Sequence, residues 1–129
     1  MKKLPLVMAA TLAAVYSSAY AQDCAQPVAQ SAGIIEIVQF RLSDGVTRKD
    51  FIDAAANTMS ELCATDGFIG RILSKGEDGS WTDHVKWTTA AAAQSAMAAS
   101  MQNEALLPFI MSIDSDSMVL SYQTPVALE

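Results

Sequence analysis

The stretch Trp81-Thr82-Asp83-His84-Val85-Lys86-Trp87 organises the rest of this 129-residue chain, and it contains both tryptophans and the only histidine. Its side chains alternate as in a half-buried β-strand, so the two tryptophans and Val85 fall on one face. Thr82, His84 and Lys86 fall on the other face. We therefore predict that one face packs in the core and that the other can present a titratable group to a ligand.

Three further strands are predicted around this one. Residues 68–75 precede it across the turn-forming loop 76–80, and two strands joined by a short glycine-containing loop form a β-hairpin. Residues 34–42 are rich in β-branched side chains and alternate, which indicates the first strand. A last strand is expected at 118–123, after a turn at 114–116.

Helices are predicted between these strands. Thr47 has the properties of an N-cap with Asp50 in the third helical position, so a helix should run from Arg48 to about Ala64, before Gly67. An alanine-rich run from Thr88 or Thr89 indicates a second helix. Asn103 interrupts it, and a short helix is expected at 107–113. The order β-α-β-β-α-β predicts an α+β fold.

Residues 1–21 resemble an export signal. Lys2 and Lys3 precede an apolar run over 4–15, and Ala19-Tyr20-Ala21 forms the small-x-small pattern of a cleavage site. We expect removal after residue 21, a mobile leader at 22–32 and a single domain at 33–125. The mature protein is then periplasmic or secreted, with no membrane partner after cleavage, because the apolar run is too short to act as a membrane anchor.

The charge of the mature chain narrows its partners. Removing Lys2 and Lys3 from the 8 basic residues leaves 6 against 14 acidic ones, a formal charge of −8. Nucleic acids and anionic lipids require basic patches, so neither is expected as a partner. The sequence contains no H-x-H, H-E-x-x-H, C-x-x-C, G-x-S-x-G or glycine-rich phosphate loop. We therefore predict no intrinsic metal site and no cofactor.

Both cysteines, Cys24 and Cys63, lie after the cleavage site. An exported protein meets an oxidising compartment, where an even cysteine count favours a disulfide with one connectivity. The alternative is two free thiols, one on the leader and one in a helix.

Four stretches carry a resemblance to a known group of proteins: 36–42, 66–71, 78–83 and 85–88. Together with the element order, they resemble the dimeric α/β-barrel superfamily, close to the antibiotic-biosynthesis-monooxygenase-like domains. The resemblance spans about 33–123. It implies a ferredoxin-like βαββαβ domain whose four-stranded antiparallel sheet faces that of a second copy, with a cavity between. It also implies a small organic ligand.

The residues give a separate reason to expect a homodimer. With both helices on one side of the sheet, the opposite face would still carry Ile35, Ile37, Ile69 and Leu73. Covering these side chains would gain several kcal/mol at about 25 cal/mol per Å² of apolar surface.

Strand alternation indicates a set of candidate site residues on the sheet face opposite the helices, which would line the cavity. His84 could act as a general base near neutral pH, and Arg71, expected beside Ile69 and Leu73, could hold the anion that forms. Asp83 points to the opposite face and should not orient the His84 ring. The expected ligand-binding residues are Gln39, Arg41, Lys86 and Tyr122, although the face of Tyr122 stays open.

The resemblance implies a reaction for such a site. In the cofactor-free oxygenases of this superfamily, a substrate anion reacts directly with dioxygen. We therefore predict an exported small-molecule-binding dimer and a cofactor-independent monooxygenation of an aromatic or polyketide-like compound. The alternative is a non-catalytic ligand-binding or stress-response module, in which His84 has no role and Arg71 and Arg41 pair with acidic neighbours.

Overall fold

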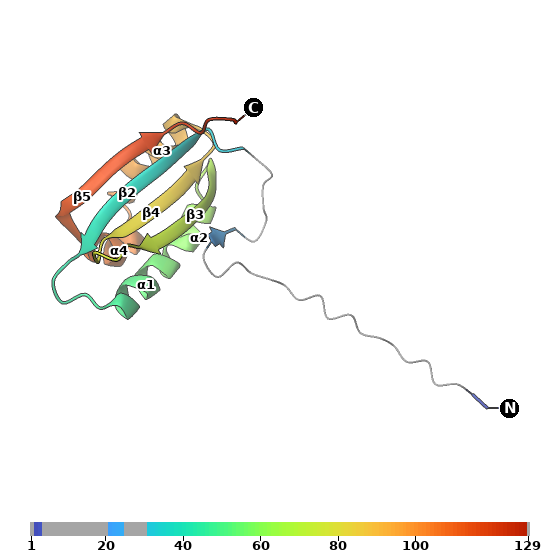
Figure 1. The fold of residues 1–129 in the computed structure, drawn as a ribbon, viewed down its shortest axis with the longest axis horizontal. Coiled ribbons are helices and arrows are strands. Elements are labelled where there is room, and N and C mark those ends of the chain that lie inside the picture. The colour runs from blue at the N-terminus through green and yellow to red at the C-terminus, as the bar shows by residue number, and fades with distance from the viewer. Residues whose placement is uncertain (1, 4–20, 25–30, 129) are drawn as a thin grey trace.

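The computed structural model describes residues 2–3, 21–24 and 31–128, and Figure 1 shows a twisted sheet with the helices packed behind it. Most of the predicted signal peptide and most of the predicted leader lie outside the described residues. The elements in chain order are β1 Ala21–Asp23, β2 Ile34–Leu42, α1 Arg48–Asn57, α2 Met59–Cys63, β3 Phe68–Lys75, β4 Trp81–Trp87, α3 Ala90–Ser100, the 3₁₀ turn η1 Glu104–Leu106, α4 Leu107–Met111 and β5 Ile113–Gln123.

The sheet has the strand order β1-β3-β4-β2-β5, and all neighbouring pairs are antiparallel. Its four long strands form the predicted ferredoxin-like βαββαβ arrangement. The short strand β1 adds a fifth member by pairing with residues 70–72 of β3. Gln22 and Asp23 of this strand belong to the predicted mobile leader, and Ala21 is the last residue of the predicted signal peptide.

The last strand is longer than predicted. It begins at Ile113 and not at Met118, because Ile113 and Asp114 pair with Leu42 and Arg41 of β2. A register irregularity between Gln39 and Arg41 accompanies this extension. The predicted turn at 114–116 is therefore part of β5.

The predicted N-cap of α1 is confirmed: the backbone N–H of Asp50 donates to Thr47 Oγ1 at 3.1 Å. The predicted long helix is divided at Thr58, whose hydroxyl donates back to the carbonyl of Ala55 at 2.6 Å. Such back-bonding competes with regular helical bonding. Thr89 caps α3 in the same way as Thr47 caps α1. No helix in the described part of the chain is long and apolar enough to cross a membrane.

The helices cover one face of the sheet, which we call the covered face, and two apolar clusters lie there. The first contains Phe40, Phe51, Trp81 and Val38, and the Phe51 and Trp81 rings meet edge to face with centroids 4.7 Å apart. The second contains Ile34, Val85, Trp87 and Ala93. Both tryptophans are therefore core residues. The face that no described helix covers is called the open face.

A β-bulge in β3 reverses the predicted orientation of its second half. Phe68 pairs with Trp87 and Gly70 pairs with Lys86, so Ile69 is an extra residue. After the bulge, Arg71 pairs with Val85 and lies on the covered face. The prediction that Arg71 shares the open face with Ile69 and Leu73 is wrong. Leu73 also packs on the covered face, and Ile72 takes its place on the open face beside His84.

The predicted disulfide is present. Cys24 is bonded to Cys63 at the end of α2, with a Cα–Cα distance of 5.6 Å and a sequence separation of 39. Because Cys24 directly follows β1, the bond attaches this strand to α2 as well as to β3. The free-thiol alternative does not apply to this structure.

Candidate functional site

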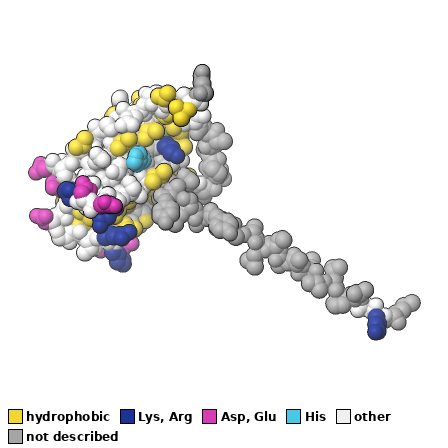
Figure 2. Space-filling view, in the orientation of Figure 1, with side chains coloured by type: hydrophobic (Ala, Val, Ile, Leu, Met, Phe, Trp, Pro, Cys, Tyr) yellow, Lys and Arg dark blue, Asp and Glu magenta, His cyan; other side chains and the backbone are white. Residues whose placement is uncertain are grey.

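The side chain of His84 lies on the open face, as predicted. This side chain is partly exposed and lies between Ile37 of β2 and Ile72 of β3, its direct cross-strand partners. Gln39 and Lys86 lie on the same face, as predicted. Figure 2 shows the histidine near the middle of this face, with hydrophobic side chains and a basic side chain around it.

Arg41 takes part in a surface ion pair and not in a shared site with His84. Its guanidinium donates to the carbonyl of Asp78 at 3.0 Å and lies 3.8 Å from the Asp78 carboxylate. Both side chains are more than half exposed. This ion pair matches the alternative given in the sequence analysis, in which Arg41 pairs with an acidic neighbour and binds no ligand.

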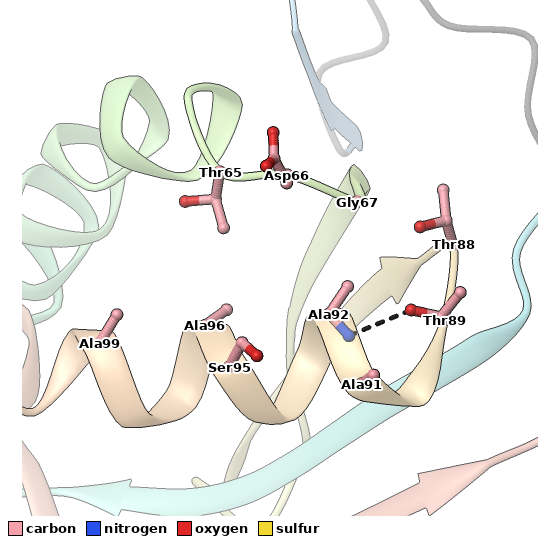
Figure 3. A pocket seen from close by; sticks show the side chains of 10 residues that line it. All are labelled: Thr65, Asp66, Gly67, Thr88, Thr89, Ala91, Ala92, Ser95, Ala96 and Ala99. Atoms are coloured by element: carbon pink, nitrogen blue, oxygen red, sulfur yellow. Dashed lines mark hydrogen bonds between the residues drawn. The ribbon is translucent and has the colours of Figure 1, made fainter.

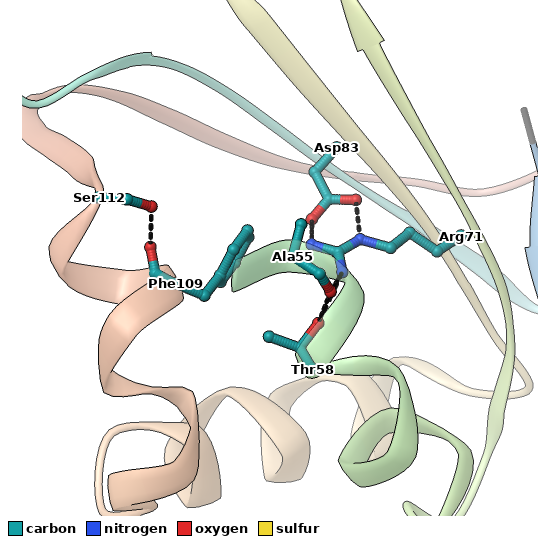
Figure 4. A network of polar contacts seen from close by, with 6 residues as sticks. All are labelled: Ala55, Thr58, Arg71, Asp83, Phe109 and Ser112. Atoms are coloured by element: carbon teal, nitrogen blue, oxygen red, sulfur yellow. Dashed lines mark hydrogen bonds and ion pairs between the residues drawn. The ribbon is translucent and has the colours of Figure 1, made fainter. Parts of the chain in front are cut away.

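Arg71 is buried in a polar network, which Figure 4 shows between β3, β4 and α1. It is 3% exposed, and its Nε and Nη2 donate to the two oxygens of Asp83 at 2.8 and 2.6 Å. Nη1 donates to Thr58 Oγ1 at 2.8 Å and to the carbonyl of Ala55 at 3.3 Å. The guanidinium also lies over the Phe109 ring, 4.8 Å from its centroid. Through these contacts, Arg71 connects α1 and α4 to the sheet.

Glu36 is the most perturbed titratable group of the described residues. It is 7% exposed, and its Oε2 has no hydrogen-bond partner there. Burial raises the pKa of Glu36 to about 7 from an ordinary value of 4.5, and the nearby Asp83 carboxylate raises it further. A hydrogen bond with Tyr122 and the charge of Arg71 act in the opposite direction. A carboxyl group with such a pKa can accept or release a proton near neutral pH.

Tyr122 lies on the covered face, directly opposite Glu36 across the β2–β5 pair. It packs against the cluster of Ile34, Val85 and Trp87. Burial and the neighbouring Glu36 carboxyl raise the pKa of its phenol. The structure therefore separates Tyr122 from His84 and brings it to Glu36.

The pairing of the strands brings Arg71, Glu36 and Tyr122 into one line across the covered face, with Val85 between the first two. Arg71, Val85, Glu36 and Tyr122 are successive cross-strand partners on β3, β4, β2 and β5. Asp83 lies one step along β4. Val85 belongs to the apolar cluster of Ile34 and Trp87, so the polar side chains lie between members of the core and not apart from it. Sequence reasoning missed Glu36, although the alternation of Ile34, Val38 and Phe40 places it in the buried set of β2.

A hollow of about 580 Å³ lies beside this region, between the α2–β3 connection and α3. Figure 3 shows Thr65, Asp66 and the backbone at Gly67 on one side and the small side chains of α3 on the other. Ala92 and Ala96 line the hollow and also pack against the cluster that contains Trp87. Only small side chains therefore stand between the hollow and this cluster. We call it the α3 hollow.

A second hollow of about 480 Å³ lies between α1 and β3, and Arg71, Ala55 and Trp81 contribute to its lining. Its only deeply buried charged group, Arg71, is already paired with Asp83. In the described part of the chain, no group of three or more histidine, cysteine or acidic side chains is arranged to hold a metal ion.

No protein-family model matches the sequence, and neither does any curated protein. Among solved structures, the chain is similar in fold to SnoaB, a cofactor-independent oxygenase from Streptomyces nogalater. The identity is 17% and the TM-score 0.54, with 77% of this chain and 96% of the other covered.

Two further solved structures are similar in fold to this chain. One is a candidate antibiotic biosynthesis monooxygenase from Bordetella bronchiseptica, with 18% identity, a TM-score of 0.63, and 75% and 100% coverage. The other is a monooxygenase, ActVA-Orf6 of Streptomyces coelicolor, in complex with nanaomycin D. It has 17% identity, a TM-score of 0.59, and 76% and 91% coverage. At these identities the similarity establishes the fold.

Proposed function

We propose that this protein is exported, binds a small aromatic or polyketide-like compound as a homodimer and oxygenates it without a cofactor. The fold is shared with an oxygenase described as cofactor-independent and with a monooxygenase that holds nanaomycin D. The observation that carries the proposal is Glu36, a buried carboxyl group whose pKa of about 7 suits a general base at neutral pH.

The proposed reaction needs only a base and an environment for the resulting anion. With an anthrone, the base removes a proton from the methylene carbon and leaves a carbanion conjugated with the ring system. The anion reacts with dioxygen. One oxygen atom becomes the new carbonyl of the quinone and the other leaves as water, so the substrate loses two hydrogens and gains one oxygen. In this proposal Glu36 accepts the proton, and Tyr122 lies beside it as a hydrogen-bonding group.

His84 is the rival base. It is more accessible than Glu36, and a second copy on the open face would enclose it in a cavity. However, the structure removes its expected companion, because Arg71 lies on the covered face and is paired with Asp83. Glu36 has a charged network around it, and His84 has two isoleucines as its cross-strand partners.

Oxygen uptake with dihydroxyanthrone, in buffer stripped of flavin and metal, tests the function and the base together. Glu36→Gln keeps the shape of the side chain and should reduce turnover roughly 10²–10⁴-fold, the usual contribution of a general base. His84→Ala should keep most of the turnover, and Lys86→Ala on the same open face serves as its control. If His84→Ala loses oxygen uptake and Glu36→Gln keeps it, the base is His84 on the open face and not Glu36.

The non-catalytic module remains the second candidate, and the 7% exposure of Glu36 favours it, since a base must reach its substrate. Under this alternative, anthrones and quinols would bind to the wild-type protein without oxygen uptake. Blocking the α3 hollow discriminates further. Ala96→Leu should weaken ligand binding, whereas Ala98→Leu, at an exposed α3 position outside the hollow lining, should not.

A further inference from the structure

Two buried polar atoms of the covered face have no hydrogen-bond partner among the described residues: Glu36 Oε2 and Trp87 Nε1. The two side chains are 7% and 2% exposed. A carboxylate oxygen accepts hydrogen bonds, whereas an indole nitrogen can only donate one. Buried groups without a partner are uncommon in folded proteins, and a complementary pair of them requires an explanation.

The pairing register places these side chains in adjacent rows. Glu36 pairs with Val85 and Ile34 pairs with Trp87, so Glu36 and Trp87 are diagonal neighbours across β2 and β4. Diagonal Cβ atoms in an antiparallel pair lie about 7–8 Å apart, within reach of long and aromatic side chains. One oxygen atom that makes a hydrogen bond of about 2.9 Å to each group would connect them.

The surroundings fit a small hydroxyl-bearing molecule. Ala93 of α3 belongs to the same apolar cluster as Trp87, and Ala96 packs against that cluster. Phe68 meets Trp87 edge to face at 5.6 Å, which adds an aromatic wall. Ala96 also borders the α3 hollow. The Trp87 side of the pair therefore lies in a cluster with small alanine side chains and next to an aromatic ring.

We propose that Trp87 and Glu36 together form a hydroxyl-binding site. The bound hydroxyl oxygen accepts a hydrogen bond from the Trp87 indole N–H and donates its own hydrogen to the Glu36 carboxylate. The ligand class is a phenol or enol, and a water molecule offers the same chemistry in its absence. The inference rests on the proposed function only in the choice of an aromatic ligand, and it names the subsite that would orient such a compound.

Indole N–H resonances report on this site without any turnover. In a ¹H–¹⁵N spectrum, the Trp87 indole signal, assigned with Trp87→Phe, should shift with pH through a midpoint near 7 as Glu36 ionises. The Trp81 indole is the internal control and should shift less. Glu36→Gln should abolish the midpoint. The other groups that act on Glu36 are Asp83, Arg71 and Tyr122, and none of them replaces it in this variant.

Two arms distinguish the source of the hydroxyl. Magnetisation transfer from a long-lived water to the Trp87 indole identifies bound water. Addition of 2-naphthol, compared with 2-methoxynaphthalene, which cannot donate a hydrogen bond, identifies a ligand hydroxyl. If the site binds a ligand hydroxyl, 2-naphthol should displace the water and move the Trp87 signal, and 2-methoxynaphthalene should do neither. Glu36→Gln should then weaken 2-naphthol binding roughly 10- to 100-fold, as expected for a lost hydrogen bond to a charged group.

Water transfer that persists at saturating 2-naphthol would support a hydroxyl site occupied by water. The proposal is overturned if the Trp87 indole shows no midpoint between pH 5 and 9, no transfer from water and no response to 2-naphthol. The wild-type titration decides this even if Glu36→Gln does not fold. Oxygen uptake has no part in these readouts, so failure of the proposed reaction and failure of this site are separable.

Discussion

At the scale of single residues, Arg71 and Arg41 make ion pairs in opposite environments. The Arg71–Asp83 side chains are 3% and 9% exposed, whereas those of Arg41 and Asp78 are 55% and 67% exposed. Solvent screens the second pair and leaves it worth less than about 1 kcal/mol. Removal of one partner of the first pair leaves a buried charge without compensation.

We therefore expect Arg71→Met to lower the free energy of unfolding by roughly 3–5 kcal/mol. The matched control Arg41→Met should change it by less than about 1 kcal/mol. Urea unfolding of both variants gives the comparison. The double variant Arg71→Met/Asp83→Leu should recover part of the loss, because it leaves no unpaired charge. Equal effects of the two single variants would contradict a structural role for Arg71.

The Glu36 carboxyl group should make stability depend on pH. Its pKa in the folded protein is raised to about 7, so between pH 4.5 and 7 the folded state keeps a proton that the unfolded state has lost. The free energy of unfolding should therefore fall as the pH rises through this interval, by roughly 3 kcal/mol in total.

Urea unfolding at pH 5 and pH 8 measures this dependence. The difference between wild type and Glu36→Gln isolates the contribution of Glu36, and Glu61→Gln at an exposed position serves as the control. If wild type and Glu36→Gln lose the same stability between these pH values, Glu36 is not the buried titrating group.

These residues also show what the sequence could predict about the site. Alternation placed His84, Gln39 and Lys86 on the open face, because β4 and β2 pair without irregularity there. The same rule failed for Arg71, because the bulge at Ile69 depends on how β3 pairs with β4. Glu36 was overlooked because acidic side chains are usually exposed, even where strand alternation places them among buried positions. The groups that act on its carboxyl come from three other strands, so no pattern within β2 indicates them.

At the scale of secondary-structure elements, the sequence predicted those features that depend on residues close together in the chain. The cap of α1 and the bounds of the three strands β2, β3 and β4 follow from sequence patterns within each segment. The early start of β5 and the added strand β1 come from pairing with distant strands. Sequence patterns within these segments do not contain that information.

The bulge gives a prediction about β3. Deletion of Ile69 removes the extra residue and leaves Arg71 opposite Val85, so the protein should keep a cooperative unfolding transition. Deletion of Ile72 shifts the residues after it by one position and should prevent that transition, because every later side chain of the strand changes face. Circular dichroism during heating distinguishes the two. Loss of the transition in the Ile69 deletion would show that the bulge itself is required.

The Cys24–Cys63 bond attaches β1 to the helical layer. In the chain-entropy model, closing a loop with a separation of 39 residues stabilises a protein by roughly 4 kcal/mol. The double variant Cys24→Ser/Cys63→Ser should therefore unfold at lower urea, and reduction should affect wild type only. An intact mass that does not rise on reduction would contradict the bond.

At the scale of the whole molecule, the open face is the surface available for a second copy. Ile35, Ile37 and Ile72 lie on it with Val119, which is 61% exposed. Light scattering of the mature protein at micromolar concentration should give twice the monomer mass. Val119→Lys should shift the protein toward monomer, because it places a charge in the interface.

Ile52→Lys is the matched control for this prediction. Ile52 is 40% exposed on α1, on the other side of the sheet, and its replacement should leave the mass unchanged. A wild-type protein that stays monomeric at high concentration would exclude both the homodimer and a cavity enclosed around His84.

The covered face holds the buried Glu36 carboxyl group, and the proposed function assigns to this group the role of the base. The most direct measurement is the pH titration of the Glu36 side-chain carboxyl carbon by ¹³C NMR, assigned with Glu36→Gln. We expect a midpoint near 7, because burial between the sheet and the helices raises the pKa of Glu36. A midpoint near the ordinary value of 4.5 would contradict it.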